Sequence, residues 1–482
     1  MSYAQPIAFV ILFALPTAIF ALGFFKFHWG VLLFLFLLPL VNISIPAVDL
    51  IRPFTDAPPA ALLQKSVSYD KIALFALAAL CLARGRTPWE SGALRRNRPL
   101  LLLWGLYFAA MIAASAVPRE NHSPLVSAWN FLEHVLVLLT FLIVLNLVQT
   151  ERMWRLVFGA VMIGGALFAL EAILQNGLMA WTGRIYPIYF DASQPENAGL
   201  EFDAYFGALR HPNFAASYIL LLIPAVTRLF LDRSRWRFAC LLLLVGQLVL
   251  LAISSSLGAY LSLPAAMLLM MWVARSRAPR SGFFRFSSRS ILPAASIFLC
   301  FFLIAGAFWG LREIRGVPLR FRLHLYRVAA NMVADRPLAG HGLGSFPSAF
   351  SRKEETMVST VPSWRIVAMG HPESAHSSYV KDLVEMGLPG GAAFALLVWG
   401  AIIIGFRSVL RQENALLRRL GVALMAGAAG FAIQAGTEEL FSFPKVSLIF
   451  WTSIALSLAL NRVKYSPAGL WGEGERPDLP GG

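Results

Sequence analysis

Apolar runs of about twenty residues recur along almost the whole chain, and they constrain its fold more than any other feature. A run of this length crosses the hydrocarbon core of a bilayer, roughly 30 Å, as an α-helix. The 482 residues are 58% hydrophobic and only 14% charged, whereas soluble domains carry roughly a quarter charged residues. The sequence therefore predicts an all-α fold, a polytopic bundle of helices in a lipid bilayer.

We expect twelve or thirteen transmembrane helices, of which the first three are the least clearly defined. The candidate spans are 7–25, 30–50, 70–83, 99–117, 126–148, 156–175, 213–231, 238–253, 257–274, 291–310, 388–406, 416–435 and 446–461. Residues 1–465 are interpreted as a single transmembrane domain. The Gly-, Pro- and charge-rich residues 466–482 are predicted to form a disordered cytoplasmic tail.

The basic residues between the spans alternate along the chain, and this alternation predicts the orientation of the bundle. They form clusters at 84–98, 152–155, 228–237, 275–289, 407–419 and 462–464. Each cluster lies two spans from the next, so all six share one side of the membrane. Short basic loops are retained in the cytoplasm, and we therefore expect this side to be cytoplasmic.

Charge and cysteine usage exclude other classes. The net charge of +15 sits in the short loops that membrane topology requires, so nucleic-acid binding is not expected. Cys81, Cys240 and Cys300 all fall in apolar segments, which predicts neither a disulfide framework nor a cysteine metal site. The chain start lacks the basic region of a signal peptide.

Two long loops, 176–212 and 311–387, are predicted to face the opposite, outer side of the membrane. Long loops in compact bundles tend to be functional. Loop 311–387 contains ten of the Lys and Arg residues and four of the eight histidines. The alternative interpretation is a solvated domain with ordinary surface charge, since long loops escape the positive-inside rule.

His376 is the leading candidate for a catalytic residue. It precedes two serines, which favour helix N-caps, and an amphipathic stretch at 379–386 in which Lys381 and Glu385 can pair. A helix N-terminus disfavours a charged imidazolium, and a neutral imidazole is what a general base needs. The alternative is a histidine that caps or hydrogen-bonds without chemistry.

A metal site near this histidine is not expected. His371 and His376 are five residues apart with Glu373 between them. That spacing does not place two ligands on one helix face as the spacing of four does. We predict no metal and no cofactor.

Arg210 and His211 stand directly before Pro212 and Asn213, where an apolar span begins. Pro favours the first helical turn, and the free amides of a helix N-terminus beside an arginine form an anion site. Arg184 is a second candidate on the same outer loop. The alternative is an interfacial arginine that snorkels to the membrane surface.

The stretch 320–335 is predicted to be an amphipathic helix that ends at Asp335. Arg320, His324 and Arg327 can share one side of this helix, whereas Arg322 points elsewhere. The next segment, 340–344, alternates glycine with larger residues, so its backbone can approach a ligand closely. No strand precedes it, which argues against a nucleotide motif, and the alternative is a plain loop.

The remaining acidic candidates have structural interpretations. Glu133, in the span 126–148, is expected to form a structural ion pair, because charge at bilayer depth is usually paired or functional. Glu171 lies within the span 156–175. Glu438 and Glu439 fall in an outer loop, where we expect them to be solvated.

Four of these motifs together resemble those of a known family. They are Arg210–Asn213 (RHPN), Asp335–Phe346 (DRPLAGHGLGSF), Ala375–Tyr379 (AHSSY) and Glu385–Gly387 (EMG). Their order and spacing, with a large loop in the C-terminal half, resemble the O-antigen ligase and polysaccharide polymerase superfamily. The resemblance covers roughly residues 200–450.

The resemblance implies a glycosyltransferase of the bacterial inner membrane. Members transfer a glycan from undecaprenyl pyrophosphate to a hydroxyl acceptor at the periplasmic face, without a metal or a nucleotide sugar. His376 would be the base that activates the acceptor. Arg210 and Arg322 would hold the pyrophosphate, as the planar guanidinium suits phosphate oxygens.

The sequence departs from the family at one position. Where relatives carry Ser-Arg-Gly, the stretch Ser254–Gly258 reads SSSLG, with Leu257 in place of the arginine. A phosphate contact is then either lost or supplied by Arg320, Arg327 or Arg184.

The acceptor also stays open. Lipid A-core would make the protein a lipopolysaccharide ligase, a second lipid-linked glycan would make it a polymerase, and a third version uses a protein Ser or Thr. A lipid-linked glycan transporter is the alternative from another class. It would place charged residues along a midplane path, whereas here they concentrate in outer loops.

Overall fold

The computed structural model describes residues 4–41, 44–46, 66–83, 97–117, 124–182, 211–232, 236–276, 318–357 and 374–463, together with Phe206, Leu209 and Gly306. The candidate span 291–310 apart from Gly306, most of the loop 176–212 and the tail 466–482 lie outside the described residues.

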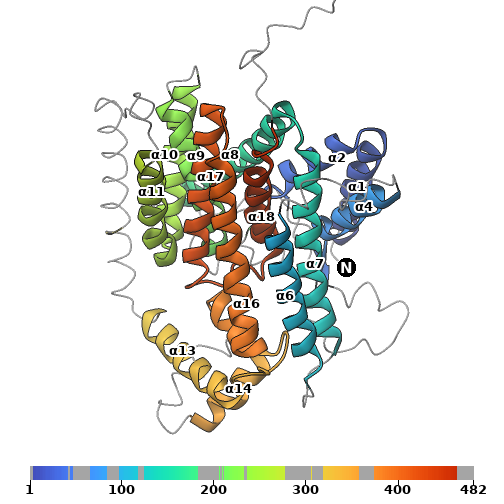
Figure 1. Cartoon of the computed structure of the whole chain (residues 1–482), viewed down its shortest axis with the longest axis vertical. Helices are drawn as coiled ribbons and strands as arrows, with labels where there is room; N and C mark the ends of the chain where they lie inside the picture. The colour runs from blue at the N-terminus through green and yellow to red at the C-terminus, as the bar shows by residue number, and fades with distance from the viewer. Residues whose placement is uncertain are drawn as a thin grey trace, which may run out of the picture.

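The predicted all-α membrane bundle is confirmed (Figure 1). In the described part of the chain, seven helices are long and apolar enough to cross a membrane: α6 (Arg98–Ser115), α7 (Pro124–Leu147), α8 (Glu151–Thr182), α9 (Pro212–Leu231), α10 (Arg237–Ser254), α16 (Ser378–Val409) and α17 (Ala415–Gln434). The other helices of the bundle are α1 (Ala4–Phe25), α2 (Phe27–Leu37), α4 (Tyr69–Ala83), α11 (Leu257–Ser276) and α18 (Pro444–Ala459).

The predicted span 30–50 is wrong. Helix α2 ends at Leu37, and strand β1 (Ser44–Pro46) then pairs antiparallel with strand β2 (Ser66–Ser68). Pro39 and Pro46 interrupt this apolar run, and proline lacks the N–H that a helix interior needs. The hydroxyl of Tyr69, which follows β2, donates to the carbonyl of Leu37 at 2.9 Å and ties the two segments together.

The first predicted outer loop is also shorter than expected, because α8 continues to Thr182. Residues 176–182 are therefore helical rather than part of a loop. The apolar and small residues of this stretch sustain the helix beyond the predicted end of the span at 175. Glu133, in contrast, forms the expected ion pair, with Lys71 Nζ 2.6 Å from its Oε1.

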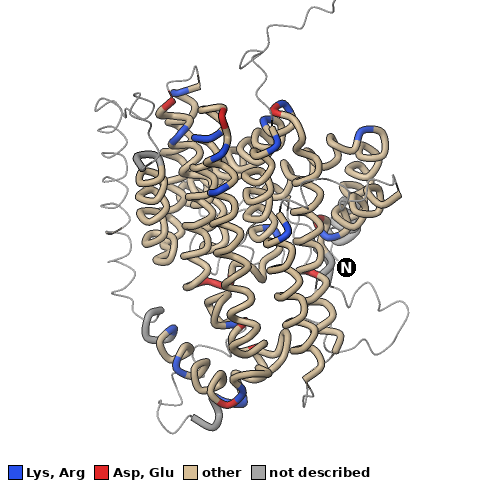
Figure 2. Tube along the Cα trace, viewed as in Figure 1, with Lys and Arg blue, Asp and Glu red and all other residues tan. Residues whose placement is uncertain are grey.

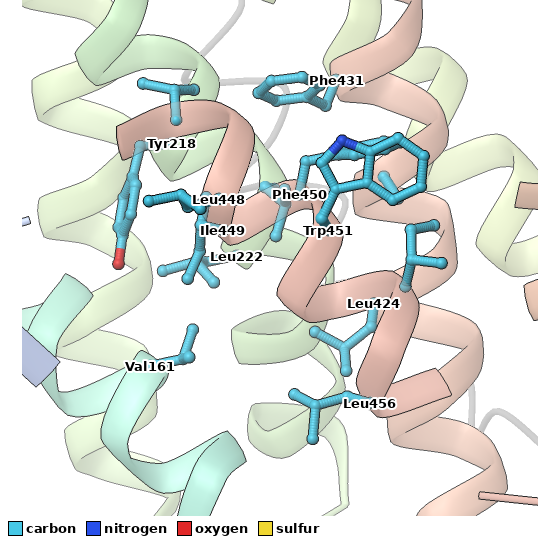
Figure 3. Packing of buried hydrophobic residues seen from close by; sticks show 14 of the residues in the cluster. Val161, Tyr218, Leu222, Leu424, Phe431, Leu448, Ile449, Phe450, Trp451 and Leu456 are labelled. Carbon is cyan, nitrogen blue, oxygen red and sulfur yellow. The ribbon is translucent and has the colours of Figure 1, made fainter. Parts of the chain in front are cut away.

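The core of the bundle lies around α9, α17 and α18 (Figure 3). Almost every side chain of α9 is buried, including Tyr218 and Leu222. Glycine lets α17 approach it closely: a Cβ at Gly427 would lie 2.1 Å from the carbonyl oxygen of Leu221. Close backbone approach at small residues is typical of packed transmembrane helices.

One end of the bundle is basic. Asp232, at the end of α9, pairs with Arg228 and with Arg419 of α17, the latter at 2.9 Å. Arg462, after α18, donates to the carbonyl of Leu145 near the end of α7 at 2.8 Å. Figure 2 shows Lys and Arg gathered at this end and again on the segments at the opposite end. The basic clusters in the described ranges thus share one side, as the alternation predicts.

The opposite end is extended by α13 (Pro318–Asp335), α14 (Phe346–Met357) and the first turns of α16, which lie beyond the ends of α9 and α17 (Figure 1). The short helices expected in loop 311–387 are therefore present. Gly387, directly after the amphipathic stretch 379–386, is a kink within α16, where φ is 69° and ψ is −174°.

Candidate functional site

Several chain segments meet at this extended end of the bundle. Gln434, the last residue of α17, donates from Nε2 to the carbonyl of Asn213 in the first turn of α9 and to Ser256 Oγ between α10 and α11, both at 3.3 Å. Phe214 stacks on Phe443 with ring centroids 4.3 Å apart. The starts of α9, α11 and α18 and the end of α17 are thus packed together.

Glu438, in the loop between α17 and α18, is the centre of the candidate site. Nη2 of Arg322 on α13 forms an ion pair with its Oε1, and Nη1 donates to the carbonyl of Thr437 at 3.0 Å. His376 Nδ1 lies 3.7 Å from the other oxygen, Oε2. The prediction that Glu438 is solvated is wrong, because only 4% of its side chain is exposed and it faces two cationic or basic groups.

His376 has an unusual backbone conformation. Its φ of 46° is left-handed, which costs a non-glycine residue roughly 1–2 kcal/mol. Its N–H donates to Ser374 Oγ at 3.1 Å, and its carbonyl accepts from the hydroxyl of Tyr326 at 3.0 Å. The surroundings hold the residue in this geometry, as they do where strain is kept at functional sites.

The serine cap predicted for the following helix is confirmed. Ser377 is the N-cap of α16, and its side chain accepts from the N–H of Val380 at 3.3 Å. His376 is therefore fixed at the entrance to a helix N-terminus, as predicted. Its side chain is 30% exposed, so an incoming group can reach the imidazole.

The geometry suits a base beside a cation. The 3.7 Å between His376 and Glu438 is longer than a hydrogen bond, so a small rotation would bring the pair into contact. A carboxylate that accepts from Nδ1–H orients an imidazole so that Nε2 is the basic nitrogen. Arg322 adds a permanent positive charge at the same carboxylate.

His211 is the N-cap of α9 and is close enough to Glu438, His376 and Arg322 for their charges to affect it. Its Nδ1 accepts from the N–H of Asn213 at 3.2 Å. Burial lowers the pKa of His211 to about 4; the charge of Glu438 opposes this shift, whereas His376 and Arg322 lower the pKa further. A neutral imidazole at the start of α9 is consistent with its role as an acceptor for the first turn.

Of the other arginines proposed for the pyrophosphate, Arg327 is the one whose side chain the structure describes. Arg210, Arg184 and also His371 lie outside the described residues. Arg327 is exposed and stands five residues from Arg322, about 140° further around the helix axis. Arg322 thus points away from Arg327, as the helical spacing predicts.

The glycine-rich segment wraps around the first part of α16. The N–H of Gly342 donates to the backbone carbonyl of Glu385 at 2.6 Å. The N–H groups of Gly344 and Phe346 donate to the carboxylate of Glu385 at 2.8 and 3.1 Å. The backbone N–H groups that could have bound an external anion are therefore taken by the Glu385 carboxylate. This favours the interpretation of the segment as a plain loop.

The pairing expected between Lys381 and Glu385 differs in the structure. Lys381 Nζ lies 3.1 Å from Glu439 Oε1 and donates to Ser442 Oγ at 2.6 Å. The reason is tertiary: the loop between α17 and α18 brings Glu439 to the lysine. Only 15% of the Glu439 side chain is exposed, so the prediction that it is solvated is also wrong.

Leu257, where relatives carry an arginine, begins α11 at the same end of the bundle. Ser255, two residues before Leu257, is left-handed, with φ 51°. A Cβ on Gly258 would lie 2.1 Å from Thr437 Oγ1, so this turn packs directly against the loop that carries Glu438. Among the described side chains, Arg322 is the arginine that contacts this loop.

Sequence reasoning missed Glu438, Glu439 and Tyr326 as parts of the site. Tyr326 lies one helical turn from Arg322 on α13, a spacing that indicates a shared face. Two consecutive acidic residues at the boundary of a transmembrane helix were a weaker signal, because solvated acids are also common there.

These features define a multi-pass membrane protein with a cationic and imidazole site at the ends of its helices. Residues 238–395 match the family described as O-Antigen ligase. The segment runs from α10 into α16 and contains Arg322, the glycine-rich loop and His376, so the match supports the resemblance to the O-antigen ligase superfamily over this part of the chain. A search of curated proteins finds no match.

Proposed function

We propose that this protein is a glycosyltransferase that moves a glycan from an undecaprenyl-pyrophosphate-linked donor to a hydroxyl acceptor. The observation that carries the proposal is the meeting of His376 and Arg322 at the carboxylate of Glu438. The O-antigen ligase domain that contains both residues supports a glycosyltransferase-type enzyme.

In the proposed reaction, His376 Nε2 takes the proton of the acceptor hydroxyl. The acceptor oxygen forms a bond to the anomeric carbon of the donor glycan, and the bond from that carbon to the pyrophosphate oxygen breaks. Undecaprenyl pyrophosphate leaves with the electron pair. Glu438 orients the imidazole and stabilises the imidazolium that forms.

Arg322 is proposed to stabilise the negative charge that develops on the leaving pyrophosphate, a contribution that is often the largest in catalysis. Among the described residues, Arg322 donates to Thr437 and to Glu438. These contacts use two of the five N–H donors of its guanidinium. Arg210 is a second candidate because it directly precedes His211, and Arg184 and Arg327 are further candidates. The mechanism uses no metal or cofactor.

The site is proposed to face the periplasm from the inner membrane. Clustered basic residues at the opposite end of the bundle support this orientation, since short basic loops stay in the cytoplasm. The donor would lie with its prenyl chain in the bilayer and its pyrophosphate at the ends of α9, α11 and α16. The paired charges near the helix ends favour an enzyme over a transporter with a midplane path.

The experiment is a transfer assay on the purified protein in detergent. Lipid-linked donor is supplied with lipid A-core, with a second lipid-linked glycan or with a protein acceptor, and each product is analysed by mass spectrometry. A new glycosidic bond and release of undecaprenyl pyrophosphate are expected with one acceptor class. Transport of donor across proteoliposomes without bond formation would contradict the proposal.

The acceptor classes are separated by a deletion strain. Loss of capped lipopolysaccharide indicates a ligase, and glycan limited to single repeats indicates a polymerase. An unchanged glycan profile with altered protein glycosylation indicates a protein acceptor.

A further inference from the structure

The segment that carries His376 is attached to a second carboxylate, that of Glu439. Glu439 Oε2 accepts from Ser374 Oγ at 2.8 Å and from the N–H of Ala375 at 3.1 Å. Ser374 Oγ in turn accepts from the N–H of His376 at 3.1 Å. Because its proton points to Glu439, the Ser374 hydroxyl presents a lone pair to His376.

Glu439 is itself fixed from the other side. Its Oε1 lies 3.1 Å from Nζ of Lys381, one turn into α16, and the two side chains are only 15% and 13% exposed. Lys381 Nζ also donates to Ser442 Oγ at 2.6 Å, beyond Glu439 in the same loop. The carboxylate therefore bridges the start of α16, the loop before α18 and the segment before His376.

The charge of Glu439 suits this bridging role. Burial alone would raise the pKa of its carboxyl, but the charge of Lys381 and hydrogen bonds from Ser442 and Ser374 outweigh burial and lower the pKa. An ionised carboxylate accepts stronger hydrogen bonds than a neutral group. Both oxygens are engaged by donors that approach from different elements.

We propose that Glu439 is a positioning residue that holds Ser374 and Ala375 so that the left-handed His376 directs its imidazole toward Glu438. The inference rests on the glycosyl transfer proposed above. Its physical basis is that φ of 46° at His376 persists only where neighbouring contacts determine it. Tyr326 fixes the His376 carbonyl, whereas Glu439, through Ser374, fixes the N–H side.

The test uses two variants of the full-length protein in detergent, Ser374→Ala and Glu439→Gln. Ser374→Ala leaves the Lys381–Glu439 pair in place, so its folding is not at risk from an unpaired buried charge. We expect kcat to fall about 10- to 100-fold in each, because a small misplacement of a reacting group has this effect. The KM for the lipid-linked donor should stay within about twofold.

Amide hydrogen exchange measured by mass spectrometry gives a readout that needs no substrate. Peptides that cover Ala375 and His376 should exchange about tenfold faster in both variants, while peptides from α17 stay protected. Because the proposed effect of Ser374 depends on its hydrogen bond to Glu439, adding Ser374→Ala to Glu439→Ala should lower kcat little further. Glu439→Gln, which keeps an acceptor oxygen, should retain more activity than Glu439→Ala.

The matched control is Lys353→Met, which removes an exposed ion pair to Asp335 at 2.6 Å in the same part of the molecule. It should leave kcat and exchange unchanged. His376→Ala is measured in parallel. If His376→Ala is inactive but Ser374→Ala and Glu439→Gln turn over at the wild-type rate, the positioning role is overturned. If His376→Ala itself retains wild-type turnover, the proposed function fails.

Discussion

At the scale of single residues, one buried carboxylate joins the groups of the proposed site. Glu438 contacts Arg322 through one oxygen and faces His376 with the other. A pyrophosphate held by the remaining N–H donors of Arg322 would lie beside the carboxylate that faces the imidazole. The residues proposed to hold the donor and to activate the acceptor are therefore linked by a shared partner.

Arg322→Lys should weaken donor binding at least tenfold, although it keeps the charge. A lysine ammonium cannot reproduce the planar, two-point contact of guanidinium with phosphate oxygens or with the pair Thr437 and Glu438. Isothermal titration with inorganic pyrophosphate measures this effect. Arg336→Lys, an exposed arginine after the end of α13, is the matched control, and equal affinity loss in both variants would contradict the assignment.

His211 should make stability depend on pH. Its pKa of about 4 lies below the value near 6.5 of an unfolded histidine. Between these values the unfolded chain binds a proton that the native state does not, so stability falls as the pH drops from about 6.5 to about 4. Protonation would also remove the acceptor that caps α9.

Thermal unfolding in detergent, followed by intrinsic fluorescence at several pH values, measures this dependence. His211→Asn keeps a good N-cap without a titrating group. We expect its melting temperature to fall less than that of the wild type over the same pH interval. Identical pH profiles would show that His211 does not contribute.

At the scale of elements, the first turns of α16 form the platform of the site. Glu385 binds the glycine-rich loop, and Lys381 binds Glu439 of the loop before α18. The first turns of α16 thus contact two segments from other parts of the chain. The kink at Gly387 separates the platform from the transmembrane part of the helix. The N–H of Leu388 donates to the carbonyl of Pro337 at 2.7 Å, which attaches the turn after α13 to the kink.

Gly387→Ala should destabilise this junction by about 1–3 kcal/mol. Its φ is 69°, and a Cβ would lie 2.6 Å from the carbonyl oxygen of Leu338. A lower melting temperature and faster amide exchange after α13 are the expected results. Gly177→Ala in α8, where a Cβ would have no atom within 4 Å, is the control and should not lower the melting temperature. Equal melting temperatures for Gly387→Ala and the wild type would contradict the account.

The sequence alone was sufficient where local signals decide the structure. The boundaries of α9 and α17, the end of α13 at Asp335 and the cap at Ser377 follow from apolar length, proline and serine placement. The partners of Glu438 and Glu439 could not be predicted, because they depend on how α13 and the start of α16 fold against a loop far away in the chain. The predicted span 30–50 is wrong because the apolar run continues past two prolines, Pro39 and Pro46, at which the helix cannot continue.

At the scale of the whole molecule, the helices separate a basic end from the end that carries the candidate site. Contacts of Asp232 and Arg462 join helix ends on the basic side. Contacts of Gln434 and Glu438 join helix ends on the other side. An up-and-down arrangement of apolar helices produces two such ends, and the positive-inside rule predicts that the basic end is cytoplasmic.

Cysteine labelling in intact cells tests this orientation. Ala330→Cys on α13 and Arg411→Cys after α16 are both at exposed positions, in a background in which Cys81, Cys240 and Cys300 are replaced by Ala. A membrane-impermeant maleimide that passes the outer membrane should label position 330 and spare 411 until the cells are lysed. The reverse pattern would place the site in the cytoplasm.

The central claim is that His376 performs the chemical step beside a cation that binds the donor. The most direct test compares wild type, His376→Ala and the remote control His28→Ala on α2 in one assay of glycan transfer, together with their affinity for inorganic pyrophosphate. The account predicts that His376→Ala loses transfer by at least a hundredfold but keeps pyrophosphate affinity, while His28→Ala changes neither. Transfer by His376→Ala at the wild-type rate would contradict it.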